Sequence, residues 1–195
     1  MPLTAVLTVG STRFDPLVAA ALSDPSLAAL ASLGVTRLLA QVGNSALPQE
    51  YQEGASTRAG GLTVQVVRFL GDLEDKVGEA DLVVSHAGAG SILSFLRPLP
   101  SSTASTSTSS SSSSLPHRRL VLVPNSTLMD SHQADLADEM ESQGWAVVCR
   151  ESSDLVHTLE QLAKEAQQGG ETQHGFPELD TGKVQRIIDE TLGFV

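Results

Sequence analysis

Several kinds of residue and segment are scarce in this chain, and each scarcity excludes a class of protein. Cys149 is the only cysteine among 195 residues, so no internal disulfide can form, which suits a reducing compartment. No apolar run approaches the roughly 20 residues that cross a bilayer, and residues 1–4 lack the basic start of a signal peptide. We therefore expect a cytoplasmic protein that reaches a membrane only when another molecule recruits it.

Basic residues are also few. The chain has 12 Lys and Arg against 23 Asp and Glu, giving a formal net charge of −11. This charge repels the phosphate backbone of a nucleic acid, so no nucleic-acid partner is expected. A small phosphate-bearing ligand is not excluded, because backbone amides at the start of a helix bind such an anion locally.

Motifs for the common cofactors are missing. The first apolar run ends in G-S-T-R at residues 10–13 rather than in G-x-G-x-x-G. The second ends in Q-V-G at residues 41–43, without the acid that binds a ribose. The chain has no G-x-x-x-x-G-K-[ST] phosphate loop and no D-x-D pair after a predicted strand. We expect no bound cofactor and no metal.

The residues that are present alternate between β-branched runs and helical patterns. Strands are expected at residues 3–9, 35–42, 63–69, 81–86, 120–124 and 145–149. Helices are expected at residues 16–33, from 89 onward, at 130–143 and at 153–166. This order predicts an α/β fold: one Rossmann-like domain over residues 1–195, with a mostly parallel sheet and helices on both faces. Ligands bind beyond the carboxyl ends of such strands. That rim carries Gly10, Ser11, Thr12 and Asn125.

Two segments stand apart from this alternation. Residues 101–114 contain only Ser, Thr and Ala, so we expect a disordered insertion at about 99–117, either a solvated loop or a phosphorylated regulatory one. Apolar residues recur at helical spacing near the end of the chain, which predicts an amphipathic helix at about 180–192. That helix docks either on a partner or on the chain's own sheet.

The strongest local signal is the run S-H-A-G-A-G-S at residues 85–91, where an apolar strand passes through a small-residue turn into a helix. Glycines let a phosphate approach the backbone, and the free amides and positive dipole end of the helix stabilise its charge. The pattern predicts an anion site. A tight turn that only packs the helix on the strand is the alternative.

A second signal follows the strand at residues 120–124. A polar loop leads to Asp130, His132 and Gln133, which open a helix. An amide and an imidazole placed there can hydrogen-bond sugar hydroxyls. The alternative is that Asp130 caps the helix and the other side chains face solvent.

Three segments together resemble one family: V-G-S-T at residues 9–12, S-H-A-G-A-G-S-I-L at 85–93 and P-N-S-T-L-M-D-S-H-Q at 124–133. In order and spacing they are similar to the catalytic subunits of the eukaryotic two-subunit UDP-GlcNAc transferases that make dolichol-diphosphate-chitobiose. Those subunits resemble the C-terminal donor half of GT-B glycosyltransferases (family 28).

The resemblance implies transfer of GlcNAc from UDP-GlcNAc to dolichol-diphosphate-GlcNAc with inversion, giving a β1,4 linkage in the second step of lipid-linked oligosaccharide synthesis for N-glycosylation. It also implies a heterodimer with a membrane-anchored acceptor-domain subunit at the cytosolic face of the endoplasmic reticulum. A non-catalytic sugar-nucleotide-binding module and a flavodoxin-like regulatory domain are the alternatives. Binding of UDP-GlcNAc and turnover with the partner distinguish the three.

The resemblance also implies roles for residues. The donor diphosphate would be bound by Gly88, Ala89, Gly90 and Ser91. His132 and Gln133 would contact the GlcNAc hydroxyls. Ser94 stands where relatives often have an acidic residue for the ribose, so Asp130 or a backbone group is an alternative there.

The base that takes the acceptor proton is left unassigned. His86 and Asp15 are candidates, as is a residue of the partner. A histidine at a strand end is also common as a structural turn residue.

Overall fold

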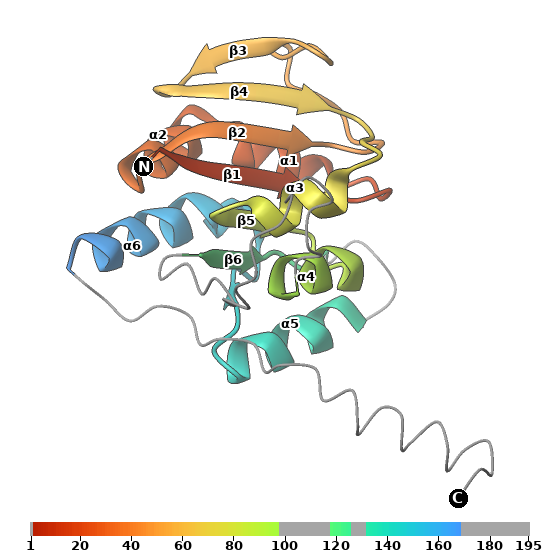
Figure 1. Ribbon diagram of the computed structural model, residues 1–195, viewed down its shortest axis with the longest axis vertical. Coiled ribbons are helices and arrows are strands. Elements are labelled where there is room, and N and C mark those ends of the chain that lie inside the picture. The colour runs from red at the N-terminus through yellow and green to blue at the C-terminus, as the bar shows by residue number, and fades with distance from the viewer. Residues whose placement is uncertain (1, 98–117, 126–131, 169–195) are drawn as a thin grey trace, which may run out of the picture.

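The computed structural model describes residues 2–97, 118–125 and 132–168, which contain one seven-stranded sheet (Figure 1). Its order is β3-β4-β2-β1-β5-β6-β7. The strands are β1 (Leu3–Thr8), β2 (Val35–Gln41), β3 (Ser56–Ala59), β4 (Leu62–Val67), β5 (Leu82–Ser85), β6 (Arg119–Leu122) and β7 (Val147–Val148). Only the β3–β4 pairing is antiparallel. The predicted α/β fold with a mostly parallel sheet is confirmed.

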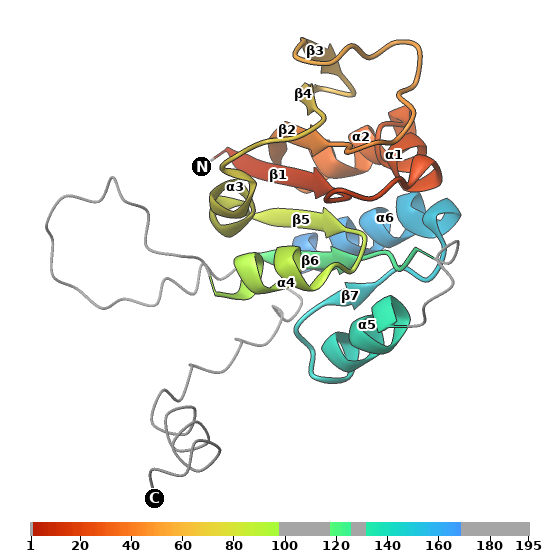
Figure 2. The same cartoon turned by 90° about the vertical axis from the view of Figure 1, so that its right-hand side faces the viewer.

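Helices cover both faces of the sheet (Figure 2). One face packs against α1 (Asp15–Ala21), α2 (Asp24–Ser32) and α6 (Leu155–Gln167), which follows a 3-10 turn, η1 (Ser152–Asp154). The other packs against α3 (Leu73–Glu79), α4 (Ala89–Leu96) and α5 (His132–Ser142). Successive strand residues point to opposite faces, so Leu7 of β1 joins the first core and Val6 the second. The central strands β5 and β6 are buried at every residue, as parallel strands covered on both faces should be.

The expected single helix at residues 16–33 is wrong, because the chain forms two helices there. Pro25 has no N–H to donate to a preceding turn, so a helix cannot run through it undisturbed. Ser23 takes an extended conformation and caps α2, accepting a hydrogen bond from the Ser26 amide at 3.5 Å. A proline in the first turn of α2 and a serine before it are start signals, and they mark the break.

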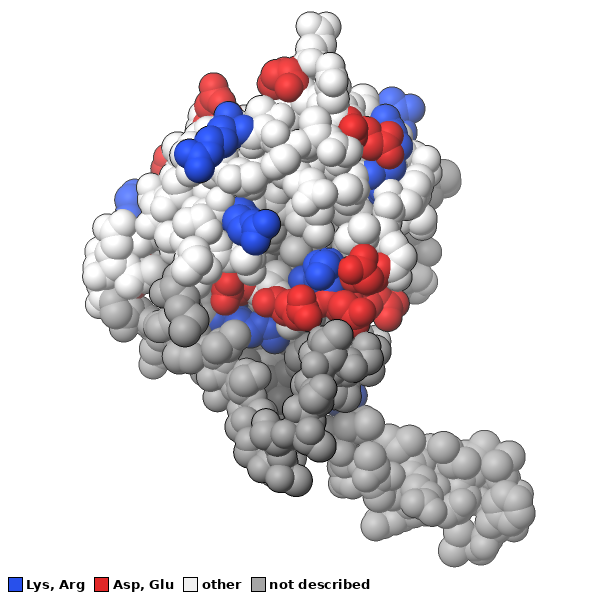
Figure 3. Space-filling model, turned by 45° about the horizontal axis from the view of Figure 1, so that its top comes forward, with Lys and Arg blue, Asp and Glu red and all other residues white. Residues whose placement is uncertain are grey.

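The sheet also differs from prediction at its edges. β3 was not expected, since S-T-R-A has no apolar alternation, and its residues are at least partly exposed. The strand expected at residues 145–149 pairs only through Val147–Val148. The acidic residues of the α3 region (Asp72, Glu74, Asp75 and Glu79) are exposed, as a solvated helix face requires. Acidic side chains gather in one area of the surface in Figure 3.

Arg118, immediately before β6, ties the start of that strand to α3 and α4. Its guanidinium donates to the carbonyl oxygens of Gly78 (2.8 Å) and Ala80 (3.0 Å) at the end of α3. The same group lies over the Phe95 ring of α4, 4.1 Å from its centroid. The predicted insertion at about 99–117 and the predicted helix at 180–192 lie outside the described residues.

Candidate functional site

Four loops meet at the carboxyl edge of the sheet, because β2, β1, β5 and β6 are neighbours and run parallel. They follow these strands at residues 9–14, 42–46, 86–88 and 123–125. The predicted rim residues Gly10, Ser11, Thr12 and Asn125 and the predicted turn at Gly88 therefore share one edge, as parallel strands dictate. This edge is the candidate site.

The first two loops fit together through glycines. Gly10 and Gly43 have φ values of +59° and +50°, a left-handed backbone that glycine adopts without strain. A Cβ on Gly43 would lie 2.7 Å from the carbonyl oxygens of both Gly10 and Thr12. Asn44 adds a hydrogen bond from Nδ2 to the Ser11 carbonyl at 3.1 Å. The loop after β1 thus rests directly on the loop after β2.

Gln41, the last residue of β2, joins these loops from below. Its Oε1 accepts hydrogen bonds from the Thr8 hydroxyl (2.7 Å) and the Gly10 amide (3.0 Å). Its Nε2 donates to the carbonyl oxygens of Gly10 (2.7 Å) and Arg68 (2.6 Å). From the sequence, Gln41 was notable only because it stands where a ribose-binding acid would be expected. A polar residue that directly follows the apolar run L-L-A at residues 38–40, on a strand expected to be buried, is the signal that could have identified it.

The third loop passes from β5 into α4 through a strained turn. Ala87 has φ +63° and, within the described residues, is the only non-glycine residue in the left-handed region. Gly88 then caps α4, and no described side chain caps the helix in its place. Ala89 and Gly90 are exposed. The first amides of a helix have no intrahelical acceptors, so they point to the rim and are available to an anion.

His86 lies between the two glycine turns. A Cβ on Gly88 would lie 2.4 Å from its Nε2, and one on Gly10 would lie 3.1 Å from its Cε1. Gly88 is therefore a glycine because the imidazole occupies the space beside it, rather than because a ligand does. A Cβ on Gly90 would meet no described atom within 4 Å, so the space beside Gly90 is open to a ligand.

The environment of His86 defines its proton state. Nδ1 lies 3.3 Å from the Thr8 carbonyl oxygen, which can only accept, so we assign the proton to Nδ1 and the lone pair to Nε2. Burial lowers the pKa of His86 from its ordinary value, and the hydrogen bond to Thr8 opposes this only in part. The ring is therefore neutral at pH 7 and can accept a proton at Nε2.

Asp15, the other candidate base, is engaged differently. Its carboxylate accepts a bifurcated hydrogen bond from the Arg13 Nε, shared between the two oxygens at 3.1 and 3.0 Å, and another from Arg13 Nη2 at 2.6 Å. It also accepts from the Ala46 amide at 2.9 Å. The Arg13 hydrogen bonds and the Ala46 bond hold the pKa of Asp15 below its usual value. This carboxylate ties the first loop to the second, and a lowered pKa weakens it as a base.

The remaining predicted residues lie on α4, on the loop after β6 and on α5. Ser94 donates to the Gly90 carbonyl at 2.9 Å along α4, and Ser91 is half-buried. Gln133 accepts a hydrogen bond from the Asn125 amide at 3.1 Å. The Asn125 side chain donates to the Arg13 carbonyl at 3.3 Å, so the third motif is tied to the first. His132 is exposed at the start of α5. Asp130 lies outside the described residues.

Ser85 is an unusual residue at the base of the turn. Its Oγ is, among the described residues, the one buried side-chain oxygen without a hydrogen-bond partner. It pairs with Thr8 across the sheet and immediately precedes His86. Buried hydroxyls are nearly always satisfied, so the fold tolerates an unpaired polar group directly beneath the candidate site.

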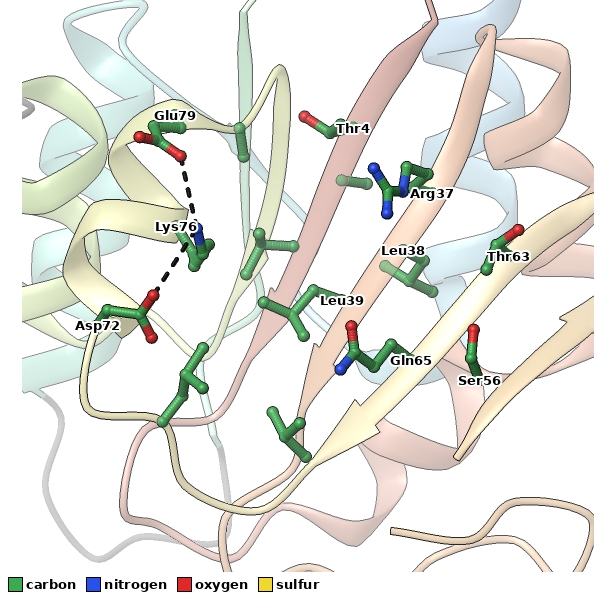
Figure 4. A pocket seen from close by; sticks show the side chains of 15 residues that line it. Thr4, Arg37, Leu38, Leu39, Ser56, Thr63, Gln65, Asp72, Lys76 and Glu79 are labelled. Atoms are coloured by element: carbon green, nitrogen blue, oxygen red, sulfur yellow. Dashed lines mark ion pairs between the residues drawn. The ribbon is translucent and has the colours of Figure 1, made fainter. Parts of the chain in front are cut away.

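A pocket of about 410 Å³ lies elsewhere, on the face of β1, β2 and β4 beside α3. Figure 4 shows Lys76 between Asp72 and Glu79, at 3.7 Å from each carboxylate. Thr4 and Arg37, near the amino ends of their strands, line the opposite side. None of the predicted site residues lines this pocket, so its volume says nothing about the carboxyl edge.

The described ranges show neither a metal site nor a membrane span. In residues 2–97, 118–125 and 132–168, no group of three or more His, Cys, Asp or Glu side chains is placed to hold a metal ion. No helix in these ranges has the length and apolar character to cross a membrane.

Comparisons with known proteins identify relatives. The family model of the glycosyltransferase family 28 C-terminal domain matches residues 4–98, which include both glycine turns but end before Asn125 and Gln133. The chain is 31% identical to the UDP-N-acetylglucosamine transferase subunit ALG13 of Cryptococcus neoformans over 216 residues, covering 99% of this chain and 98% of the relative. It is 34% identical to the human protein of the same name over 73% of this chain and 11% of the human one.

One solved structure supports the fold. An NMR solution structure of ALG13 matches with a TM-score of 0.55 and 23% identity, over 97% of this chain and 96% of that one.

Proposed function

This chain belongs to the family of UDP-N-acetylglucosamine transferase subunits called ALG13, and from that premise we propose that it is the donor-binding, catalytic subunit of a glycosyltransferase. It transfers GlcNAc from UDP-GlcNAc to dolichol-diphosphate-GlcNAc. The observation that carries the proposal is the start of α4, where no described side chain caps the helix and Ala89 and Gly90 are exposed at the rim. Free amides and the positive end of the helix dipole there suit a diphosphate.

The diphosphate sits on the amides of Gly88 to Ser91, on the open side of the turn at Gly90. The Ser91 hydroxyl adds a further donor. His132 and Gln133 contact the GlcNAc hydroxyls from the first turn of α5. The Ser94 hydroxyl is engaged with the Gly90 carbonyl but keeps its lone pairs for the ribose, a contact that Asp130 can share.

The reaction is a single displacement with inversion. The acceptor oxygen attacks C1 of GlcNAc, the bond from C1 to the diphosphate breaks, and UDP leaves with the electron pair. The helix amides stabilise the charge that develops on UDP. Losing one preorganised donor of this kind typically costs ~10²–10³ in rate.

We assign the proton of the acceptor hydroxyl to Nε2 of His86. The lowered pKa of His86 leaves it neutral, and its Nδ1 bond to Thr8 directs the lone pair of Nε2 away from the sheet core. Asp15 is the weaker candidate, because Arg13 and the Ala46 amide already engage its carboxylate.

The partner is a membrane-anchored subunit that carries the acceptor surface and brings the chain to the cytosolic face of the endoplasmic reticulum. Two findings support it: the relatives are named as subunits, and the matching family model is a C-terminal domain of a larger glycosyltransferase. We propose that this partner supplies the acceptor half.

The test is GlcNAc transfer to phytanyl-diphosphate-GlcNAc by the chain with its partner subunit, by the chain alone and by the partner alone, beside UDP-GlcNAc binding to the chain. We expect transfer only by the pair and binding by the chain. Binding without transfer by the pair would indicate a non-catalytic sugar-nucleotide module. Absence of both would indicate a regulatory domain.

A further inference from the structure

Gln41 uses its whole carboxamide in hydrogen bonds, and its side chain is almost fully buried, with 1% exposed. It accepts two and donates two, at 2.6 to 3.0 Å. Side chains of similar length cannot make all four bonds: a Glu carboxylate has no N–H donors, and Met has neither the donors nor a strong acceptor.

Two of these four bonds hold one residue. Gln41 binds both the amide and the carbonyl of Gly10, whose φ of +59° it thereby helps to fix. A third bond holds the hydroxyl of Thr8, which in turn accepts from the Gly10 amide at 3.1 Å. The carboxamide therefore sets the position of Thr8 and Gly10 together.

Thr8 and Gly10 are also the residues that contact the His86 ring from the β1 side. The Thr8 carbonyl oxygen lies 3.3 Å from Nδ1, and a Cβ on Gly10 would lie 3.1 Å from Cε1. Gly88 restricts the ring from the other side. Within the described residues, Gln41 is the side chain that hydrogen-bonds both Thr8 and Gly10.

We propose that Gln41 is a positioning residue for glycosyl transfer: it fixes the turn at Gly10, and through Gly10 and Thr8 it orients the imidazole of His86 beside the donor turn. The inference rests on the proposed function, because that function gives His86 the acceptor proton to accept. If the carboxamide served only stability, replacing it would lower the unfolding midpoint without moving the ring.

The experiment compares Gln41→Met and Gln41→Glu with a control, Ser26→Ala. Ser26 is also fully buried, and its hydroxyl donates to the Ala20 carbonyl at 2.7 Å in the α1–α2 region, away from the rim. Each variant is paired with the partner subunit to measure kcat and the KM for UDP-GlcNAc, and alone for ¹⁵N NMR of the His86 ring.

We expect the Gln41 variants to lower kcat by ~10–100-fold, the scale of a small misplacement of a reacting group, with a KM change of less than about threefold. The His86 ring signals should shift toward a mixture of tautomers. Ser26→Ala should lower stability but change neither kcat nor those signals. If Gln41→Met does not fold, Gln41→Glu, which keeps the shape and the acceptor, carries the test.

Unchanged His86 signals together with a kcat like that of Ser26→Ala would overturn the inference while leaving the proposed function intact. If the wild-type pair transfers no GlcNAc, the proposed function fails. In that case the NMR comparison still tests whether Gln41 orients the His86 ring, and unchanged ring signals would overturn that role.

Discussion

Replacing Gly88 with alanine should destabilise the protein through a collision with His86. The new Cβ would lie 2.4 Å from Nε2, so the ring must move by about 1 Å, the difference between 2.4 Å and the 3.4 Å at which ordinary contact begins. Overpacking of this kind costs ~1–3 kcal/mol, and the Nδ1 bond to Thr8 opposes the movement.

The same substitution should be harmless once the ring is gone. Gly88 has φ −75° and ψ 131°, which alanine adopts readily. In a His86→Ala background, Gly88→Ala should therefore be neutral or stabilise by ~0.4–1 kcal/mol. Urea unfolding of the four proteins gives the coupling energy, which we expect at about 2 kcal/mol. Additivity of the two substitutions within ~0.5 kcal/mol would refute the packing argument.

Three further predictions follow from the site and its surroundings. Gly90→Ala should raise the free energy of unfolding by ~0.5–1 kcal/mol, because it replaces a helical glycine. The same change should weaken UDP-GlcNAc binding, measured by calorimetry, because the new methyl group closes the open space at the turn. Ser32→Ala at the exposed end of α2 is the control, which should stabilise the protein without loss of affinity. Because burial lowers the pKa of His86, the unfolded chain binds a proton more readily than the folded one, so this contribution to stability is complete above the unfolded pKa of about 6.5 and is lost as the pH falls toward the folded pKa. The urea midpoint should therefore drop more between pH 7.5 and pH 5 for wild type than for His86→Gln, and equal drops would count against a buried neutral ring. Ile188→Asp with Leu192→Asp should reduce co-purification with the partner subunit without lowering the unfolding midpoint, whereas a large loss of stability would mean that the segment packs on this chain's own sheet.

Much of the fold follows from local patterns. The strands β1, β2, β5 and β6 have enough Val and Leu to be identified by composition, and their parallel order follows from the helices between them. β3 has no such signal, because its polar residues pair at an edge with one neighbour only. The break before α2 was marked by Ser23 and Pro25, but the apolar spacing on both sides of it favoured one helix.

The candidate site was predictable in position but not in its internal contacts. Glycine-rich sequence after parallel strands places Gly10 and Gly88 at one edge. No pattern in one sequence shows that His86 lies between them, because the ring is oriented by the Thr8 carbonyl, 78 residues away along the chain. The role of Gln41 depends on hydrogen bonds to Gly10 and Arg68, which only the folded chain brings together. The assignment of the base and of the donor contacts remains a prediction.

The anchoring of Arg118 has a practical use in protein engineering. Arg118, immediately before β6, lies over the ring of Phe95 near the end of α4. Both ends of the intervening segment are therefore held next to one another by contacts that do not involve the segment itself. Lengthening a loop between fixed ends costs only ~0.6 kcal/mol for each doubling. We therefore expect a fluorescent protein or an affinity tag inserted between residues 101 and 114 to leave the carboxyl edge of the sheet undisturbed.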